Sequence, residues 1–403
     1  MISMNNTGCS IGRIVGLTAV LLSTFVGLAV RADDSVTKAT AVAPNVPSKT
    51  RTAHIQLGDV TAIAARKGWL QEEFAKYNAK VDLVSTSSYG SSGTVAALYD
   101  RGDLHIGGPG MLNVSLEQRV QGLDIVLFWE GTNVHPRKSV VAVLPDSSIH
   151  SVADLKGQTL GGTRLGCTYY AATEALRAQG VTVDNDWQKG DMRYVNITGS
   201  GAAMSAFLAG RFQGWNLHPS SAASLYVQNQ IREVTPALPG GLYVTAGGRG
   251  NFNAPRKWVN ENPDLARAFL VAWDRTVRWL YADHGAHLAE AATITARELR
   301  VSKAIALFNI KDEGETAYNW GVTDYNDAVS SIKRNLKFQI DNGDPFFSKH
   351  PMTDKEIEAF VDKRFFAGGE YFFDTSEKRQ ASASAEPGSS SGPAVVQLAK
   401  VGR

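Results

Sequence analysis

Strand-length and helix-length segments alternate along the chain from residue 52, and this alternation restricts the fold more than any other feature. "TAHIQLG" (52–58) has the length and composition of a strand, and a helix-length stretch (59–77) follows it. The segments "KVDLVSTSS", "SGTVAALYDRG" and "DLHIGGP" then continue as strand, helix and strand. Strands connected through helices are typical of mostly parallel sheets that are covered on both faces. We therefore predict an α/β fold with a mostly parallel sheet.

The chain changes character near Asn262. "NPDLARAFLVAWDRTVRWLYAD" (262–283) and "DKEIEAFVDKRFF" (354–366) each place apolar residues at helical spacing, which predicts two amphipathic helices. The part of the chain between its two terminal segments has about 325 residues, a length that favours two domains or lobes.

Two segments in different parts of the chain share one outline. "TVAALYDRGDLHIGG" (94–108) and "AMSAFLAGRFQGWNL" (203–217) each read as an apolar helix, a glycine and a short strand. We predict that Gly102 and Gly210 cap these helices at their C-termini, where a left-handed turn costs glycine little. The repetition indicates two similar α/β lobes, although any two α/β units share part of this outline.

Both ends of the chain differ from its middle. Residues 1–32 contain two arginines, no acidic residue and the apolar run Ile14–Val30, which predicts a cleaved secretory signal peptide. An uncleaved membrane anchor is the alternative, because the run is just long enough to span a bilayer. Residues 33–51 read as a flexible leader. The Ser-, Ala-, Gly- and Pro-rich tail 376–403 is predicted to be disordered, because it has almost no core-forming residues.

Charge and cysteine content exclude several classes of function. The chain has 41 basic and 39 acidic residues, and loss of Arg13 and Arg31 with the signal leaves 39 of each. A chain without net charge or a basic run gives little support for a nucleic-acid partner. Cys167 would be the only cysteine left, so we expect neither an intramolecular disulfide nor a cysteine-based zinc site. No cofactor and no metal site are predicted.

Five segments in register carry a family resemblance. "HSVADLKGQTLGG" (150–162) resembles a segment of the extracytoplasmic solute-binding proteins of ABC importers, within the branch that binds aliphatic sulfonates, taurine and nitrate. The other four matches keep the family's order within about residues 52–370: "IQLGDVTAIAARKGWLQEEF", "ALYDRGDLHIGGPGMLNV", "LGCTYYAATEAL" and "LAGRFQGWNLHPSSAASL".

The resemblance implies a periplasmic binding protein type II fold, in which two α/β lobes enclose a ligand cleft and are joined by a two-strand hinge. Lobe 1 would comprise residues 52–143 and 243–372, the second part being the helical C-terminal region. Lobe 2 would comprise residues 148–238. The hinge would lie near Leu144–Ser147 and Leu238–Gly241, and ligand would meet strand C-termini and helix N-termini.

The resemblance also selects candidate ligand-binding residues. A helix opening at Gly166, Cys167 and Thr168 would offer backbone amides to an oxyanion, although Thr168 could equally serve as the helix N-cap. Gln56 matches a recurrent glutamine of the family and would offer an amide. Asp59 is expected as the N-cap of the first helix, and in the cleft it would favour an amine-bearing ligand.

The remaining candidates come from three further positions in the predicted cleft. Tyr169 would bring an aromatic ring to the helix start, Trp215 an apolar wall, and His218 occupies a place where the family often has Asp or Trp. Each of the two aromatic rings could instead pack inside its lobe. The third cleft loop would contribute backbone approach, an apolar contact and an amide, from Gly110, Met111 and Asn113 respectively.

We consider two functions. The first is the substrate-binding component of an ABC transporter, which captures a small organic oxyanion such as a sulfonate and delivers it to permease and ATPase subunits at the membrane. Such a protein would be periplasmic and would have no catalytic residue. The second is a carbon–sulfur lyase on the same fold, with Cys167 as nucleophile. A nucleophile needs a base within hydrogen-bond reach, and no base is paired with Cys167 in the sequence.

Overall fold

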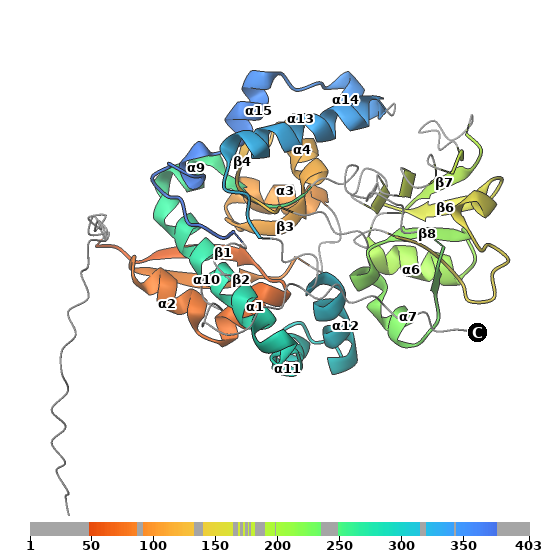
Figure 1. Cartoon of the computed structure of the whole chain (residues 1–403), viewed down its shortest axis with the longest axis horizontal. Helices are drawn as coiled ribbons and strands as arrows, with labels where there is room; N and C mark the ends of the chain where they lie inside the picture. Colours follow the sequence, from red (N-terminus) through yellow and green to blue (C-terminus); the bar gives the residue numbers. More distant parts are fainter. Residues whose placement is uncertain are drawn as a thin grey trace, which may run out of the picture. The chain divides into compact units, whose positions relative to one another are not determined.

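The computed structural model describes residues 48–376, and Figure 1 shows the order of their helices and strands. Within that range the following residues lie outside the description: 87–91, 133–139, 164–167, 170–171, 174–175, 177–178, 182–189, 198, 235–248, 315–319 and 342–343. The predicted signal peptide, the leader up to residue 47 and the tail beyond Ser376 also lie outside the described residues.

The described chain begins with a β-α-β unit. β1 (Arg51–Gln56) and β2 (Ala79–Val84) pair in parallel over their whole length. The predicted helical stretch between them forms two helices, α1 (Asp59–Arg66) and α2 (Trp69–Ala75). Gly68 separates them because its left-handed backbone (φ +79°) ends the first helix, a conformation that glycine adopts at little cost.

A three-stranded sheet follows. α3 (Ser92–Arg101) leads to β3 (Gly107–Met111), and α4 (Leu112–Val120) leads to β4 (Ile125–Glu130). β10 (Gly250–Pro255), which is far away in the sequence, lies between β3 and β4 and runs antiparallel to both. A parallel bridge between Ile55 and Ile106 connects this sheet to β1.

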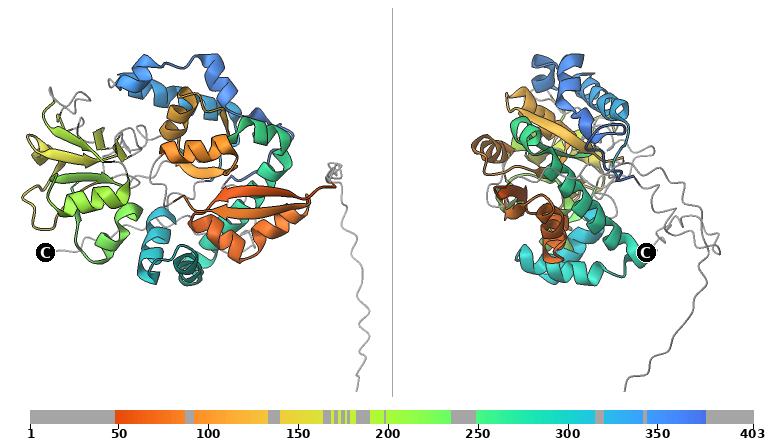
Figure 2. Two further views of the ribbon diagram at one scale, coloured as in Figure 1. Left: turned by 180° about the vertical axis from the view of Figure 1, so that it is seen from behind. Right: turned by 90° about the vertical axis from the view of Figure 1, so that its left-hand side faces the viewer.

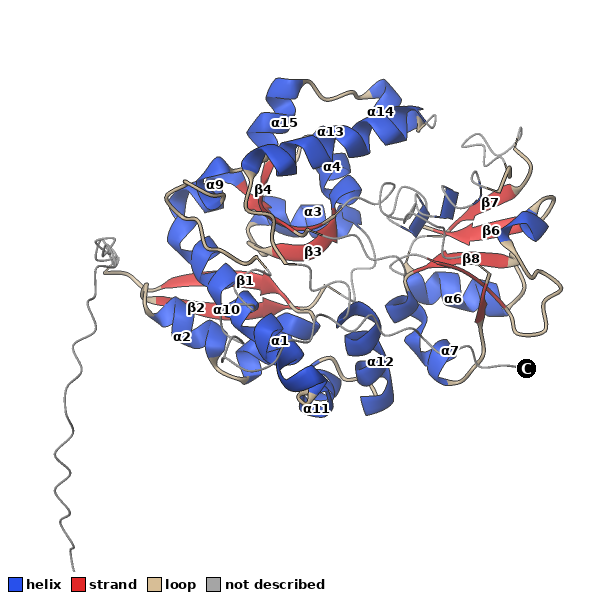
Figure 3. Cartoon of the chain, viewed as in Figure 1, coloured by secondary structure: helices blue, strands red, loops and turns tan. Residues whose placement is uncertain are grey.

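A five-stranded sheet, called the second sheet below, has the strand order β7-β6-β8-β5-β9. The helices α6 (Ser200–Leu208) and α7 (Ala223–Val227) pack beside it (Figure 3). β6 pairs in parallel with β7 and β8, whereas β5 is antiparallel to β8 and β9. The strand bounds are β5 (Val140–Val143), β6 (Thr159–Gly162), β7 (Arg193–Asn196), β8 (Gly214–Leu217) and β9 (Arg232–Glu233).

These pairings bear on the predicted lobe bounds. β5, which the prediction placed at the end of the first part of lobe 1, pairs within the second sheet. Leu144–Ser147, one of the two predicted hinge segments, is a turn that follows β5, closed by a bond from the Ser147 amide to Leu144 O. Leu238–Gly241 lies outside the described residues. The sheets are also less parallel than predicted. β5 and β10 each enter their sheet after a connection from the other sheet, so no β-α-β crossover makes them parallel to their neighbours.

The C-terminal third is helical. The predicted first helix is confirmed as α10 (Pro263–Tyr281), which buries Phe269 and Trp273 against Phe252 of β10. In Figure 2, the last helices of the chain lie beside α3 and α4, and α13 and α4 make direct contacts. The helices besides α10 are α9 (Arg256–Glu261), α11 (Leu288–Glu298), α12 (Lys303–Gly314), α13 (Tyr325–Asp341), α14 (Pro345–Lys349) and α15 (Asp354–Phe360).

The last helix is shorter than predicted. α15 begins with a capping box between Thr353 and Glu356 but ends at Phe360 rather than Phe366. Val361 forms a parallel bridge with Leu127 of β4, and the Asp362 amide donates to Leu127 O at 2.8 Å. Pairing with the sheet edge therefore replaces the helical bonds that the apolar pattern predicts. Gly102 and Gly210, by contrast, follow α3 and α6 with φ of +75° and +70°, which confirms both predicted caps.

Candidate ligand-binding site

Gln56, the last residue of β1, connects three segments. Its Oε1 accepts a bond of 3.0 Å from the Gly108 amide, and its Nε2 donates to Thr86 Oγ1 at 3.0 Å. The carboxamide therefore joins β1 to β3 and to the residues after β2. An amide nitrogen has two N–H groups, and within the described residues only one of those of Gln56 has an acceptor, so the other can be offered at the strand end.

The start of α1 differs from the prediction in one residue. Gly58 is the N-cap, and Asp59 is the first helical residue. The hydroxyl of Thr61 takes the capping role, because it accepts from the Gly58 amide at 2.8 Å and donates to Gln56 O at 2.9 Å. The Asp59 carboxylate still lies in the first helical turn, where the helix dipole favours negative charge.

The predicted third cleft loop coincides with β3 and the start of α4. Gly110 pairs with Asn251 of β10, Met111 ends β3 and Asn113 lies in the first turn of α4. The side chains of Met111 and Asn113 lie outside the described residues. Gly107 and Gly108 come just before Gly110, so Gln56 and the predicted loop lie side by side.

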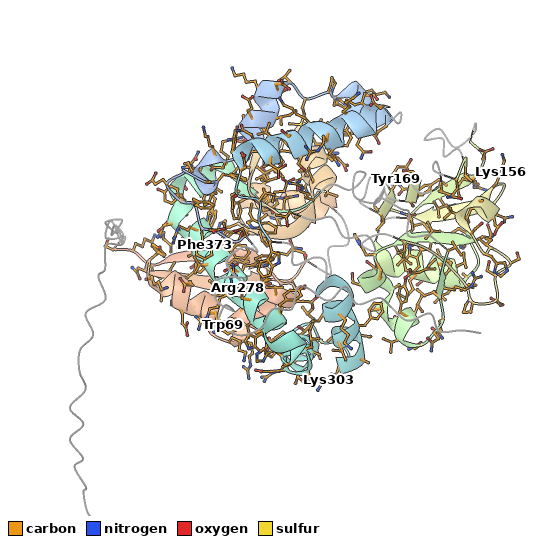
Figure 4. The ribbon with its side chains drawn as sticks, in the orientation of Figure 1. Trp69, Lys156, Tyr169, Arg278, Lys303 and Phe373 are labelled. Atoms are coloured by element: carbon orange, nitrogen blue, oxygen red, sulfur yellow. The ribbon has the colours of Figure 1, made fainter. Side chains whose placement is uncertain are left out.

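The predicted helix opening lies at the end of β6 in the second sheet. Gly166 and Cys167 are outside the described residues, whereas Thr168 and Tyr169 are helical and buried (Figure 4 labels Tyr169). The Tyr169 ring meets Tyr194 edge-on, with centroids 5.0 Å apart. Tyr169 therefore packs inside its lobe, the alternative that its sequence left open.

Sequence reasoning missed Asn216, which organises this helix start from β8. Oriented to satisfy its neighbours, the Asn216 oxygen accepts from Thr168 Oγ1 at 3.1 Å and from the Tyr169 amide at 3.2 Å. Its nitrogen donates to Gly161 O and to Tyr194 Oη. The Thr168 hydroxyl then bonds inward, to Asn216. In the sequence, the only indication of this structural role is that Asn216 is a polar residue within a buried strand, directly after Trp215.

Two glycines of β6 allow this close packing. A Cβ on Gly161 would collide with the Phe212 ring, and a Cβ on Gly162 would collide with the Asn216 side chain. Gly162 also has φ +148°, which other residues rarely adopt. The "TLGG" sequence thus brings β6 close to β8 beside the helix start.

The last two candidates lie at the end of β8. Trp215 is buried and packs on Phe207 with ring centroids 5.6 Å apart, on the face of the strand opposite Asn216. This favours lobe packing for Trp215 over a pocket wall. His218 begins the short helical turn Pro219–Ala222, and its backbone oxygen accepts from the Ser221 amide at 2.9 Å.

A buried acidic group that the sequence did not indicate lies at the end of β4. Glu130 is fully buried and accepts from Ser331 Oγ at 2.8 Å, and Arg249 Nη1 lies 3.4 Å from its second oxygen. Burial raises the pKa of Glu130 to about 8, although Arg249 and Ser331 act in the opposite direction. Arg249 also pairs with Asp327 at 2.8 Å, so its charge is already balanced.

His105, which lies between α3 and β3, has a packing role. Its ring stacks on Trp258 with centroids 5.1 Å apart, and its Nδ1 accepts from the His54 amide at 3.0 Å. Burial, with His54 nearby, lowers the pKa of His105 to about 4. His105 is therefore neutral at physiological pH.

Among the described residues, no three His, Cys, Asp or Glu side chains are grouped closely enough to hold a metal ion. No helix in the described part of the chain combines the length and apolar character that a membrane crossing requires. At the ends of β1 and β6 the described groups include carboxamides, hydroxyls and backbone amides, which can hold an oxyanion without a cation.

Three comparisons place the chain among known proteins. Residues 60–285 match the family described as NMT1/THI5 like. No curated protein matches the chain. Many solved structures resemble it, and the following three illustrate their range.

The alkanesulfonate-binding protein SsuA from Xanthomonas axonopodis pv. citri, bound to MOPS, has a TM-score of 0.61 at 15% identity, covering 79% of this chain and 99% of its own. The periplasmic nitrate-binding protein NrtA from Synechocystis PCC 6803 has a TM-score of 0.56 at 14% identity, and the match covers 85% of this chain and 90% of NrtA. The desulfurization enzyme DSZB has a TM-score of 0.51 at 16% identity, and the match covers 80% of this chain and 97% of the enzyme. These likenesses confirm the predicted α/β fold of periplasmic binding proteins, type II.

Proposed function

Because the chain belongs to the NMT1/THI5-like family, we propose that it is the solute-binding component of an ABC importer. In this proposal it captures a small organic oxyanion, most simply a sulfonate, and delivers it to membrane permease and ATPase subunits. The observation that carries the proposal is the extent of the likeness to the sulfonate-binding protein, which covers 99% of that protein.

The two lobes of the proposal follow the two groups of strands. The first lobe holds β1 to β4 and β10 with the C-terminal helices, and the second holds β5 to β9. The chain passes from the first group to the second after β4 and returns after β9. Ligand would shift an open–closed equilibrium that the permease detects. We also propose that residues 1–32 direct export to the periplasm and are then removed.

The chemistry of the strand ends supports an anion held by neutral donors. Gln56 has an amide N–H to offer at the end of β1, and the helix start near Thr168 would supply backbone amides from Gly166 and Cys167. Arg249, the cation at the end of β4, is paired with Asp327 and Glu130. A sulfonate or nitrate ion fits such a set of donors, because both carry their charge on several oxygens.

A thermal-shift panel tests the proposal. Sulfonates, sulfinates, nitrate, carboxylates and pyrimidines are added singly, and one class is expected to raise the melting temperature. Ligand at a hundred times its Kd would stabilise the protein by about 2.7 kcal/mol, which such a panel detects easily. If no compound raises the melting temperature, the importer proposal loses its basis.

The likeness to a desulfurization enzyme keeps a second function open, namely hydrolysis of an aryl sulfinate to the arene and sulfite with Cys167 as nucleophile. The test is sulfite release from an aryl sulfinate by the wild type and by Cys167→Ser. Turnover that disappears in the serine variant would establish the lyase. We expect no turnover, and a serine variant that binds ligand as the wild type does.

A further inference from the structure

The central strand β10 carries two buried asparagines. Asn251 is fully buried and Asn253 is 5% exposed, and both lie between β3 and β4. Strands buried on both faces normally read as continuous apolar runs. A carboxamide is costly to bury unless its hydrogen bonds are made, so these two residues require a structural reason.

The two carboxamides form an uncharged hydrogen-bond network with Tyr99 of α3 and Ser115 of α4. Asn251 Oδ1 accepts from Ser115 Oγ at 3.0 Å and from Asn253 Nδ2 at 3.2 Å. Asn253 Nδ2 also donates to Ser115 Oγ at 2.8 Å, and Tyr99 Oη donates to Asn253 Oδ1 at 2.7 Å. The last bond leads out of the network: Asn251 Nδ2 donates to Gly110 O at 3.3 Å.

The strand β3, which contains Gly110, has a sequence that restricts its backbone conformation little. β3 reads "GGPGM", with three glycines that restrict the backbone little and a proline that has no amide hydrogen for the ladder. Its pairing with β10 shifts register between Asn251 and Asn253, and Gly108 has φ +114°. The Asn251 side chain therefore adds a bond to its ladder partner Gly110, directly beside the point where the register shifts.

We propose that Asn251 is a positioning residue for residues 107–113, which contain the predicted third cleft loop. This proposal rests on the proposed binding function. Its carboxamide fixes the Gly110 carbonyl and, through Ser115, the start of α4, so that the loop meets ligand already in its bound shape. A loop ordered beforehand lowers the entropy cost of binding. A hydrogen-bonded buried polar network also specifies one arrangement of its surroundings, which an apolar residue would not do.

The test compares Asn251→Ala with Leu265→Ala in the full chain. Leu265 is fully buried on α10 and outside the loop, so its variant controls for general destabilisation. Calorimetric titration with ethanesulfonate is expected to show an affinity about tenfold weaker for Asn251→Ala and unchanged for Leu265→Ala. Ser115→Ala serves as the milder variant, and the loss in the double variant is expected to be smaller than the sum of the single losses.

Hydrogen exchange of the ligand-free proteins provides a second measurement that needs no ligand. The peptide covering 107–113 is expected to exchange faster in Asn251→Ala and Ser115→Ala than in Leu265→Ala. If the wild type binds no compound, the importer proposal fails, and exchange alone decides the role of Asn251. Equal exchange in all three variants, or an equal loss of affinity in Leu265→Ala, overturns the positioning role.

Discussion

The indole N–H of Trp129 donates a hydrogen bond of 2.9 Å to the hydroxyl of Thr375, joining residues that are 246 positions apart. Both side chains are buried, and the Gly321 amide donates to Thr375 O at 3.1 Å. The Arg267 guanidinium lies over the Phe373 ring at 5.6 Å, so the segment around Phe373, labelled in Figure 4, also contacts α10. The last described residues are therefore anchored to the end of β4. From that end of β4 the chain continues toward β5 of the second sheet.

We predict that the boundary of the stable protein lies between Asp374 and Ser376. A chain ended after Asp374 loses Thr375 and leaves the Trp129 indole without its partner, at a cost of about 1–3 kcal/mol. A chain ended after Ser376 keeps these contacts and serves as the control. Urea denaturation should separate the two, and equal midpoints would contradict the role of Thr375.

Gly107 is expected to tolerate no side chain. A Cβ there would collide with Tyr99 Oη, which is buried and bonded to Asn253. Gly107→Ala should therefore destabilise the protein by about 1–3 kcal/mol through overpacking.

Two further variants sharpen this prediction. Tyr99→Phe removes the colliding oxygen, so the double variant should lose less than the sum of the two single variants. Gly201→Ala on α6 has open space and a helical backbone, and it should be neutral or stabilising by about 0.5–1 kcal/mol. Thermal denaturation of the wild type and of the four variants measures all these effects.

Glu130 predicts a fall in stability with rising pH. Its pKa in the folded protein is raised from about 4.5 to about 8, so the folded state binds the proton more tightly than the unfolded chain. Its stabilising contribution is complete below about pH 4.5 and is lost as the pH rises to 8, by on the order of 1–3 kcal/mol after allowance for relaxation. Glu130→Gln, which stays neutral, should show a flatter stability profile.

A second group with a raised pKa limits the pH range in which this test reports on Glu130 alone. Burial, together with Asp344, raises the pKa of Glu117 to about 7, so both groups contribute between pH 5 and 7. Between pH 7 and 8 the slope comes mainly from Glu130. Identical slopes in that window for wild type and Glu130→Gln, measured by urea denaturation, would show that Glu130 ionises normally.

Asn216 is expected to matter for both stability and binding. Asn216→Ala leaves the Thr168 hydroxyl, the Tyr169 amide and Gly161 O without this partner, which costs about 1–3 kcal/mol. Ligand affinity should fall as well, because the helix start that offers its amides loses its support. The exposed Gln228→Ala is the control and should change stability by less than about 0.5 kcal/mol. Normal affinity in Asn216→Ala would place the ligand elsewhere.

Local pattern was sufficient for much of the fold. The alternation in residues 52–108 predicted β1, β2 and their helices, and it predicted β3 with a start four residues too early, at Asp103 instead of Gly107. Gly102 and Gly210 end their helices as their chemistry requires. The helix beginning at Pro263 follows from apolar spacing alone. These features depend on neighbours within a few residues, so the sequence determines them by itself.

The tertiary structure decided what depends on residues far apart in the chain. β5 joined the second sheet and β10 was inserted between β3 and β4, because strand pairing is selected by long-range packing that no local period records. Asn216 and Asn251 look like ordinary polar residues in the sequence. They become organising residues only because folding places them next to the Tyr169 amide and Gly110 O, in a core where a buried polar atom without a partner is costly.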